Sequence, residues 1–332
     1  MSIKALAMRD SFLECIYQEM KVDDKIFFVS ADFGSPVLDK IRNDFPRRFK
    51  NVGIAEQNLI NISAGLALEG FKIFAYAIAP FITMRCYEQI RVSLALLSEV
   101  RPMNVNLIGV GAGYSYVVSG PTHQCYEDLT LIRALPNFQL LSPSDHITAS
   151  SLFEGCINTN GPKYLRFDAQ VLPVIYDSFK PEILNGFHLH NHGERLCIIA
   201  TGFMVHTALE VLDEISKDGI KIGLIDMFNL TNFNATKLES ILSNYSGLIT
   251  IEEGFRGRGG LDSMLFEFTS RRNIHIKQLN IGVEPGYSFE LGTRSELHEK
   301  VGIGVQSIFC LLYTSDAADD LLCVDLGGRR II

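Results

Sequence analysis

The sequence is poor in cysteine, with seven among its 332 residues. These cysteines are odd in number and widely scattered, and none forms a C-x-x-C pair. Such a distribution argues against both a disulfide framework and a zinc site. We therefore expect buried thiols in a reducing cytoplasm, and we assign no metal-ligating residue to this chain.

Clustered positive charge and long apolar runs are also scarce. The formal net charge is −8 and Lys and Arg form no stripe, which argues against nucleic acid or an anionic membrane as a partner. No uncharged apolar run is long enough to span a bilayer, and the first residues lack the apolar segment of a signal peptide. We expect neither nucleic acid nor a membrane among the partners.

The segments that are present alternate between strand and helix patterns. Short apolar runs at residues 26–30 and 103–110 predict buried strands, and helical spacing at residues 5–20, 56–68 and 81–97 predicts helices. This alternation predicts an α/β fold in which a mainly parallel sheet is covered by helices on both faces.

The same alternation divides the chain into two domains. Residues 1–180 form the first domain, and prolines and glycines interrupt the pattern in residues 168–194, of which we interpret 181–194 as a linker. Residues 195–309 form a second α/β domain, whose sheet we expect to be mainly parallel or mixed. Residues 310–332 resemble translated sequencing-adapter text, so we expect this tail to be non-native and base no functional inference on it.

Glu56 is the first candidate catalytic residue. It stands in Gly-Ile-Ala-Glu-Gln-Asn at the start of an otherwise apolar helix, where burial raises the pKa of a carboxyl group. A simpler interpretation is a first-turn carboxylate stabilised by the helix dipole. Taken alone, the motif favours that simpler interpretation.

Two further motifs follow in the same half of the chain. Phe81, Met84 and Tyr87 recur at helical spacing, which core packing also explains. His123 stands in Gly-Pro-Thr-His-Gln, where a histidine after a turn faces either a cleft or bulk solvent. Neither motif identifies a function by itself.

In combination, the motifs resemble the central region of transketolases. GIAEQN is followed by an aromatic residue before YEQIR, then by GPTHQ, ED, R-x-LPN and P-x-D, and IATG and TIEE near residues 199–202 and 250–253 resemble the C-terminal domain of that family. The resemblance covers residues 5–309. It implies that the first domain binds the pyrimidine of thiamine diphosphate, and that the activity is transfer of a two-carbon ketol unit between sugar phosphates.

Three residues acquire cofactor roles from this resemblance. Glu56 matches the glutamate that bonds N1′ of the aminopyrimidine, and sharing a proton there activates the cofactor for loss of its C2 proton. Phe81 matches an aromatic that packs on the pyrimidine ring, and Asp32 matches an aspartate near the cofactor. Ile78 departs from the family, because it replaces a second aromatic near the ring.

The resemblance also assigns residues to the substrate. His123 matches a histidine that faces the sugar and acts on its oxygens. Arg9 and Arg166 match arginines that hold a substrate phosphate. Two departures lie nearby: Ser119 replaces an acidic residue that reads a sugar hydroxyl, and Gly111 stands where some transketolases carry a further phosphate-binding histidine.

The sequence lacks the Gly-Asp-Gly signature that, in this family, marks the half that binds diphosphate and Mg²⁺. The resemblance therefore implies a separate N-terminal subunit that carries this half and binds the Mg²⁺. Family pattern and the preference for closed symmetry together predict a heterotetramer.

Three alternatives stay open. They are the C-terminal half of a 1-deoxy-D-xylulose-5-phosphate synthase-like enzyme, the beta subunit of a 2-oxo-acid dehydrogenase, and a non-catalytic partner subunit that retains only the fold. GPTHQ with its ED and R-x-LPN continuation favours a transketolase, and the missing diphosphate half argues against a complete synthase. The presence of Glu56 and His123 argues against a non-catalytic subunit.

Overall fold

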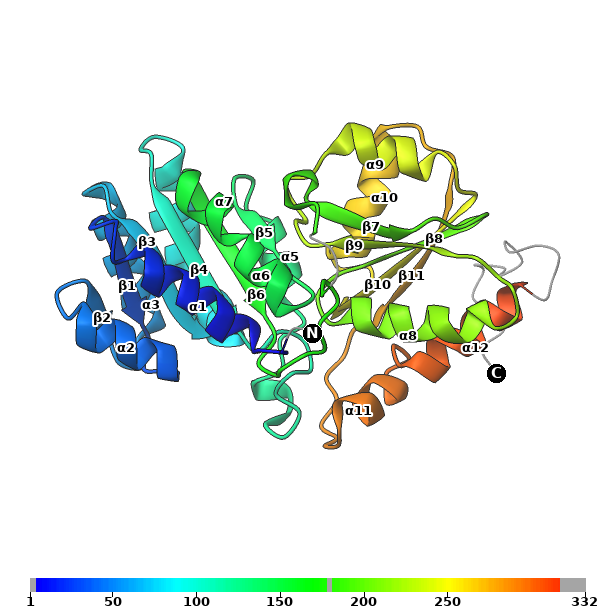
Figure 1. Ribbon diagram of the computed structural model, residues 1–332, viewed down its shortest axis with the longest axis horizontal. Helices are drawn as coiled ribbons and strands as arrows, with labels where there is room; N and C mark the ends of the chain where they lie inside the picture. Colours follow the sequence, from blue (N-terminus) through cyan, green and yellow to red (C-terminus); the bar gives the residue numbers. More distant parts are fainter. Residues whose placement is uncertain (1–3, 178–180, 317–332) are drawn as a thin grey trace.

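The computed structural model describes residues 4–177 and 181–316 of the 332-residue chain. It contains two sheets that lie side by side, each flanked by helices (Figure 1). The first sheet is parallel throughout, and the second is mixed because one edge strand is antiparallel. The predicted fold class, two α/β units with mainly parallel or mixed sheets, is confirmed.

The first sheet has six strands in the order β2-β1-β3-β4-β6-β5. In chain order they are β1 (Ile26–Ser30), β2 (Phe49–Asn51), β3 (Lys72–Ile78), β4 (Asn104–Val110), β5 (Gln139–Leu141) and β6 (Gly161–Phe167). Every residue of β4 is buried, as expected for a central strand with helices on both sides.

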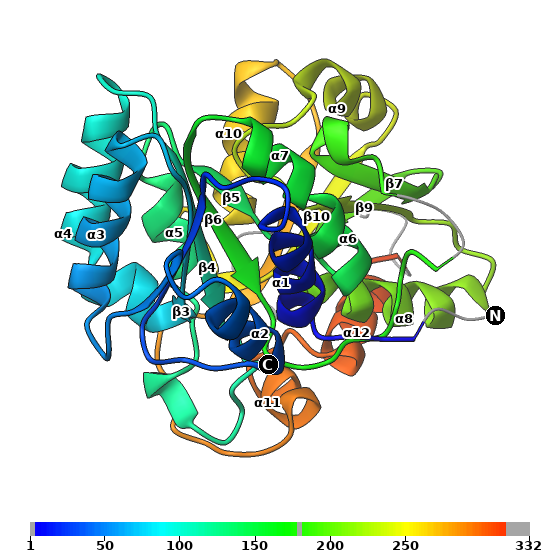
Figure 2. The ribbon, with the colours of Figure 1, turned by 60° about the vertical axis from the view of Figure 1, so that its left-hand side comes forward.

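Helices cover both faces of this sheet (Figure 2). One face packs against α1 (Met8–Glu19), α2 (Pro36–Asp44), α6 (His146–Ser151) and α7 (Phe153–Asn158). The other face packs against α3 (Glu56–Leu68), α5 (Asp128–Arg133) and the helical residues after β3. The sheet is thus enclosed between two layers of helices, and its strand ends supply the surface on which a site can form.

The helical segment after β3 is not the regular helix that the sequence predicts. Two π-helical stretches, Phe81–Arg85 and Ile90–Leu96, flank the short α4 (Tyr87–Gln89). The hydroxyl of Thr83 donates a 2.7 Å hydrogen bond to the carbonyl of Ala79, four residues earlier. Such a bond competes with the helical backbone ladder, and π-helical turns of this kind are frequent at functional sites.

The second sheet has the order β11-β10-β8-β9-β7. Its strands are β7 (Phe187–Asn191), β8 (Leu196–Ala200), β9 (Gly223–Met227), β10 (Gly247–Phe255) and β11 (Lys277–Val283). Strand β7 pairs antiparallel with β9 and lies inside residues 181–194, so the interpretation of that whole stretch as a linker is wrong. Only the first residue of β7 is buried, because the strand lies at the sheet edge.

Helices also cover both faces of the second sheet. One face carries α8 (Met204–Ser216), α11 (Arg294–Lys300) and α12 (Val305–Asp316), and the other carries α9 (Ala235–Leu242) and α10 (Leu261–Arg271). Helix α12 extends into the tail predicted to be non-native, and residues 317–332 lie outside the described residues. Within the described ranges, none of the helices combines the length and apolarity needed to cross a membrane.

Candidate active site

The carboxyl ends of the first-sheet strands meet at one edge, because all six strands are parallel. Ligands in open α/β sheets bind outside this edge. Four of the residues singled out by sequence lie on segments that leave it: Asp32 after β1, Glu56 after β2, Phe81 after β3 and His123 after β4.

Glu56 begins helix α3 and is 3% exposed. Its two carboxylate oxygens accept hydrogen bonds of 2.9 and 2.8 Å from Nη1 of Arg85, whose side chain is 45% exposed. A buried carboxylate needs such a partner to offset its lost hydration. Sequence reasoning missed Arg85, which lies one helical turn after Phe81 and contacts Glu56 only through the fold.

Phe81 connects this ion pair to His123. The guanidinium of Arg85 lies 4.4 Å from the centroid of the Phe81 ring. The His123 ring meets the Phe81 ring edge-on at 5.3 Å, and its Nδ1 lies 3.0 Å from the hydroxyl oxygen of Thr122. The structure therefore brings Glu56, Phe81 and His123 into one connected cluster.

Asp32 lies in the turn that follows β1. Its backbone has a φ of 47°, in the left-handed region that Asp tolerates better than most residues. The Asn51 side chain holds this turn, because its amide oxygen accepts from the Asp32 N–H at 3.1 Å and its amide nitrogen donates to the Asp32 carboxylate at 3.1 Å. The same oxygen accepts from the N–H of Gly53 at 2.9 Å, which fixes the approach to Glu56.

Arg9 lies in the first turn of α1 and is bound to its neighbour. Its Nε and Nη2 donate to the two carboxylate oxygens of Asp10 at 2.8 and 3.3 Å. Burial raises the pKa of both Tyr76 and Tyr116, and the nearby Arg9 charge opposes each rise. The Tyr116 ring lies edge-on to the His123 ring, with centroids 6.3 Å apart. Because the Arg9 charge acts on Tyr116, Arg9 lies on the Tyr116 side of His123.

Arg166 lies within β6 and faces the interior. Its side chain is 1% exposed, and its Nε donates to the buried carboxylate of Asp128 at 2.8 Å. Its Nη2 donates to the carbonyls of Cys125 and Glu253 at 3.3 and 3.0 Å. The phosphate role stays a prediction for Arg166, and the position of the guanidinium gives it no support.

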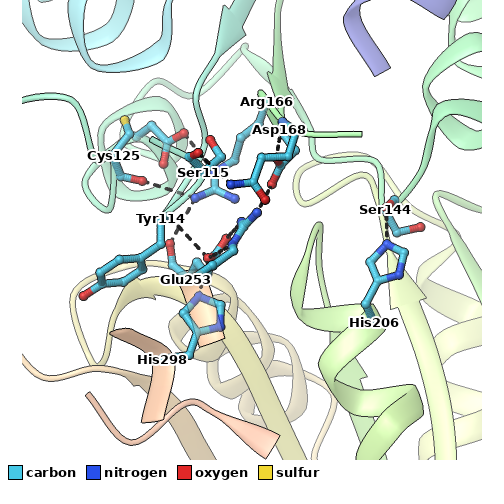
Figure 3. Close-up of polar contacts among 12 residues, drawn as sticks. Tyr114, Ser115, Cys125, Ser144, Arg166, Asp168, His206, Glu253 and His298 are labelled. Carbon is cyan, nitrogen blue, oxygen red and sulfur yellow. Dashed lines mark hydrogen bonds and ion pairs between the residues drawn. The ribbon is translucent and has the colours of Figure 1, made fainter. Parts of the chain in front are cut away.

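A buried ionic network joins the two sheets, and sequence reasoning did not find it (Figure 3). Arg294, at the start of α11, donates to Asp168 beyond β6 at 2.6 Å and to Glu253 on β10 at 3.0 and 2.7 Å. His298 lies 2.6 Å from Glu253, and the N–H of Tyr114 donates to the same carboxylate at 3.3 Å. Although burial opposes it, Arg294 and His298 hold the pKa of Glu253 well below its usual range. The only sequence signal was TIEE, which contains Glu253.

The cluster suits the pyrimidine end of the implied cofactor. Glu56 offers carboxylate oxygens that can bond the ring nitrogen N1′, and Phe81 offers an aromatic ring next to them. Across residues 4–177 and 181–316, no group of three or more His, Cys, Asp or Glu side chains is arranged to hold a metal ion. Glu56 and Phe81 therefore fit the pyrimidine end of thiamine diphosphate.

Two family models match the chain. The model "Transketolase, pyrimidine binding domain" matches residues 4–174, and "Transketolase, C-terminal domain" matches residues 187–308. The chain is 29% identical over 305 residues to a putative transketolase C-terminal section of Methanocaldococcus jannaschii, covering 91% of this chain and 93% of that protein. It is 28% identical over 310 residues to one subunit of the apulose-4-phosphate transketolase of Phocaeicola vulgatus, covering 93% and 97%.

A solved structure is also similar to this chain over nearly its full length. It is described as a split gene transketolase in an inactive beta4 tetramer, and it superposes with a TM-score of 0.81 at 27% identity, covering 94% of this chain and 98% of that one. All three relatives are matched over nearly their full lengths, and their descriptions name a section, a subunit or a split-gene product. The chain belongs to the transketolase family and contains its pyrimidine-binding and C-terminal domains.

Proposed function

We propose that this chain is the pyrimidine-binding subunit of a thiamine-diphosphate-dependent enzyme that transfers a two-carbon ketol unit between sugars. One observation carries the proposal. Glu56 is buried at the carboxyl edge of the first sheet, in one cluster with the Phe81 ring and His123. These are the groups needed to hold a pyrimidine and to act on a sugar beside it.

Glu56 holds a proton at N1′ of the pyrimidine. When bound, the cofactor supplies the carbon nucleophile and the electron sink for the reaction. Arg85 bonds both oxygens of Glu56 through Nη1, so N1′ and Arg85 compete for the lone pairs of the same carboxylate.

His123 moves protons on the sugar. The C2–C3 bond of the donor ketose breaks as its C3 hydroxyl loses a proton and becomes an aldehyde. A new carbon–carbon bond then forms to C1 of the acceptor aldose, whose carbonyl oxygen gains a proton. Both transfers need a group that can accept and donate a proton, and an imidazole ring can do both. Its contact with Phe81 positions His123 beside the ring that supports the cofactor.

The missing half of the site belongs to a partner. We assign the diphosphate and Mg²⁺ to a separate N-terminal transketolase subunit and expect a heterotetramer. An exposed apolar surface beside the site supports this assignment: Val118 in the His123 loop, and Tyr287, Phe289 and Leu291 in the loop before α11, are 60–81% exposed. Exposed apolar patches of this kind mark sites of protein association.

The sugar that the enzyme uses depends on the residues that contact its far end. The resemblance implies sugar phosphates. Both arginines expected to bind the phosphate, however, are paired with carboxylates of this chain, Arg9 with Asp10 and Arg166 with Asp128. The proposed reaction is ketol transfer between sugars, and the residues that contact the far end of the sugar determine which sugars are used.

Calorimetry tests whether the cofactor site is divided between this chain and an N-terminal subunit. The isolated chain should bind thiamine diphosphate with Mg²⁺ weakly or not at all, because it lacks the diphosphate half, and addition of the N-terminal subunit should restore binding. Tight binding to the isolated chain would contradict the two-subunit site.

A further inference from the structure

Tyr116 occupies the space that a side chain at position 111 would need. Gly111 has a φ of +108°, and a Cβ atom built there would lie 2.1 Å from Cε2 and 2.5 Å from Cδ2 of the Tyr116 ring. Non-bonded carbon atoms do not approach so closely, so a side chain at residue 111 would require the Tyr116 ring to move. The histidine that some transketolases carry at this place is here replaced by a phenol from the same loop.

A second phenol lies on the same side of the cluster. Tyr76 is buried within β3, stacked on Phe33 with ring centroids 5.1 Å apart. Its hydroxyl oxygen is buried and makes no hydrogen bond of ordinary geometry with any described residue, although Arg9 lies close enough to lower its pKa both by its charge and by hydrogen bonding. A buried hydroxyl without a well-formed hydrogen bond is costly, so a ligand hydroxyl that bonded it would be favoured.

The charges around these phenols are already balanced. The Arg9 guanidinium is bound by both oxygens of Asp10, and Arg166 is bound to Asp128. Tyr116 also feels the Asp168 carboxylate, and Asp168 is itself paired with Arg294. A phosphate dianion entering here would meet an Arg9 whose charge is already offset by Asp10 at Nε and Nη2, whereas a hydroxyl could bond a phenol without competing with any ion pair.

We propose that Tyr116 determines the substrate specificity of the enzyme, and that the far end of the sugar held beside Tyr116, Tyr76 and Arg9 is an uncharged, hydroxyl-bearing end rather than a phosphate. This inference rests on the proposed ketol transfer. A phenol hydroxyl both donates and accepts, as a sugar hydroxyl does, and a site that bonds a hydroxyl rejects analogues that leave its polar groups unpaired.

Matched acceptors test the inference. The assembled two-subunit enzyme is assayed with one common ketol donor and either D-ribose or D-ribose 5-phosphate as acceptor. The expected result is a higher kcat/KM for ribose. An equal or higher kcat/KM for the 5-phosphate overturns the inference.

Two variants separate specificity from structure. Tyr116→Phe keeps the ring over Gly111 and removes the hydroxyl, so kcat/KM for ribose should fall about tenfold through KM, while the 5-phosphate is affected less. Asp10→Asn releases Arg9 and should raise kcat/KM for the 5-phosphate about tenfold. Glu239→Gln, which opens the exposed pair with Arg272 in the second unit, is the matched control and should change neither value.

The remaining outcomes are equally decisive. An equal loss for both acceptors in Tyr116→Phe would show that the hydroxyl has a general structural role and would overturn the inference. Deuterium exchange at C2 of the bound cofactor, measured without acceptor, distinguishes this from failure of the proposed function. Normal exchange with a preference for the 5-phosphate rejects only the specificity of this site, whereas absence of exchange rejects the ketol-transfer proposal itself.

Discussion

Arg85 occupies the two contacts that the cofactor's pyrimidine is expected to make. Its Nη1 bonds both oxygens of Glu56, and its guanidinium lies 4.4 Å from the Phe81 centroid. We expect the pyrimidine to compete with Arg85 for these contacts, so the variant Arg85→Met should bind thiamine diphosphate more tightly. The methionine keeps much of the side-chain length but has neither charge nor donor.

The size of the effect follows from the geometry. Because the Arg85 side chain is 45% exposed, solvent screens the ion pair, and we assign it about 1 kcal/mol. The cation–π contact with Phe81 adds about 0.5 kcal/mol at such a site. Removing these two competing contacts, together worth about 1.5 kcal/mol, corresponds to roughly tenfold tighter binding of the cofactor.

Calorimetric titration of the assembled enzyme with thiamine diphosphate and Mg²⁺ measures this affinity. Arg91→Met is the matched control, because Arg91 lies on the same helical segment, is 49% exposed and pairs only with the exposed Glu88 among its salt-bridge partners in the described part of the chain. The control should bind as the unchanged enzyme does. Weaker or unchanged binding by Arg85→Met would refute the competition and would mean that Arg85 stays at Glu56 or helps to hold the cofactor.

Three further predictions concern the buried charges. Arg294→Met leaves Asp168 and Glu253 without their cation and should lower the free energy of unfolding by about 3–5 kcal/mol, measured by denaturant titration; a loss below about 1 kcal/mol would contradict the network. Arg166→Met should lower the free energy of unfolding by a similar amount, because Asp128 is fully buried and would lose its cation. If the free energy of unfolding is unchanged and only the KM for a phosphorylated sugar rises, the phosphate role would be supported instead. Burial raises the pKa of Glu252 from 4.5 to about 7, so between these values the folded state keeps a proton that the unfolded state has lost, and stability falls as pH rises. Glu252→Gln should therefore show a flatter decline of unfolding free energy from about pH 5 to 8, and an unchanged slope would argue against the raised pKa.

Local pattern was sufficient for the central elements of the fold. Strand β1 and helix α3 have the bounds that the sequence predicts, because their apolar runs begin and end at clear turn residues. Strand β7 was missed because edge strands bury little, and Phe-His-Leu-His-Asn carries too few apolar side chains to stand out. The π-helical turns were missed because their apolar spacing resembles that of an ordinary helix.

The candidate site, like the fold, was only partly predictable from the sequence. Glu56, Phe81 and His123 stand in recognisable motifs, and the structure brings them together. Arg85 and Arg294 could not be found in this way, because their partners lie far away in the sequence and are brought near only by the fold.

The carboxylates that neutralise the predicted phosphate arginines were also invisible to motif reasoning. Asp10 follows Arg9 directly, but sequence cannot show that the two side chains face each other. Asp128, at the start of α5, meets Arg166 on strand β6. Pairings of this kind change what an arginine can bind, and they depend on three-dimensional geometry.

The role of Glu56 is the central claim, and deuterium exchange at C2 of the bound cofactor tests it most directly. Glu56→Gln keeps the size and hydrogen-bonding capacity of the side chain but cannot share an acidic proton with N1′. Exchange in the assembled, folded enzyme should slow by about 10²-fold or more, while Glu88→Gln, an exposed glutamate on α4, should leave it unchanged. Exchange at the unmodified rate in Glu56→Gln would contradict this role and remove Glu56 from the mechanism.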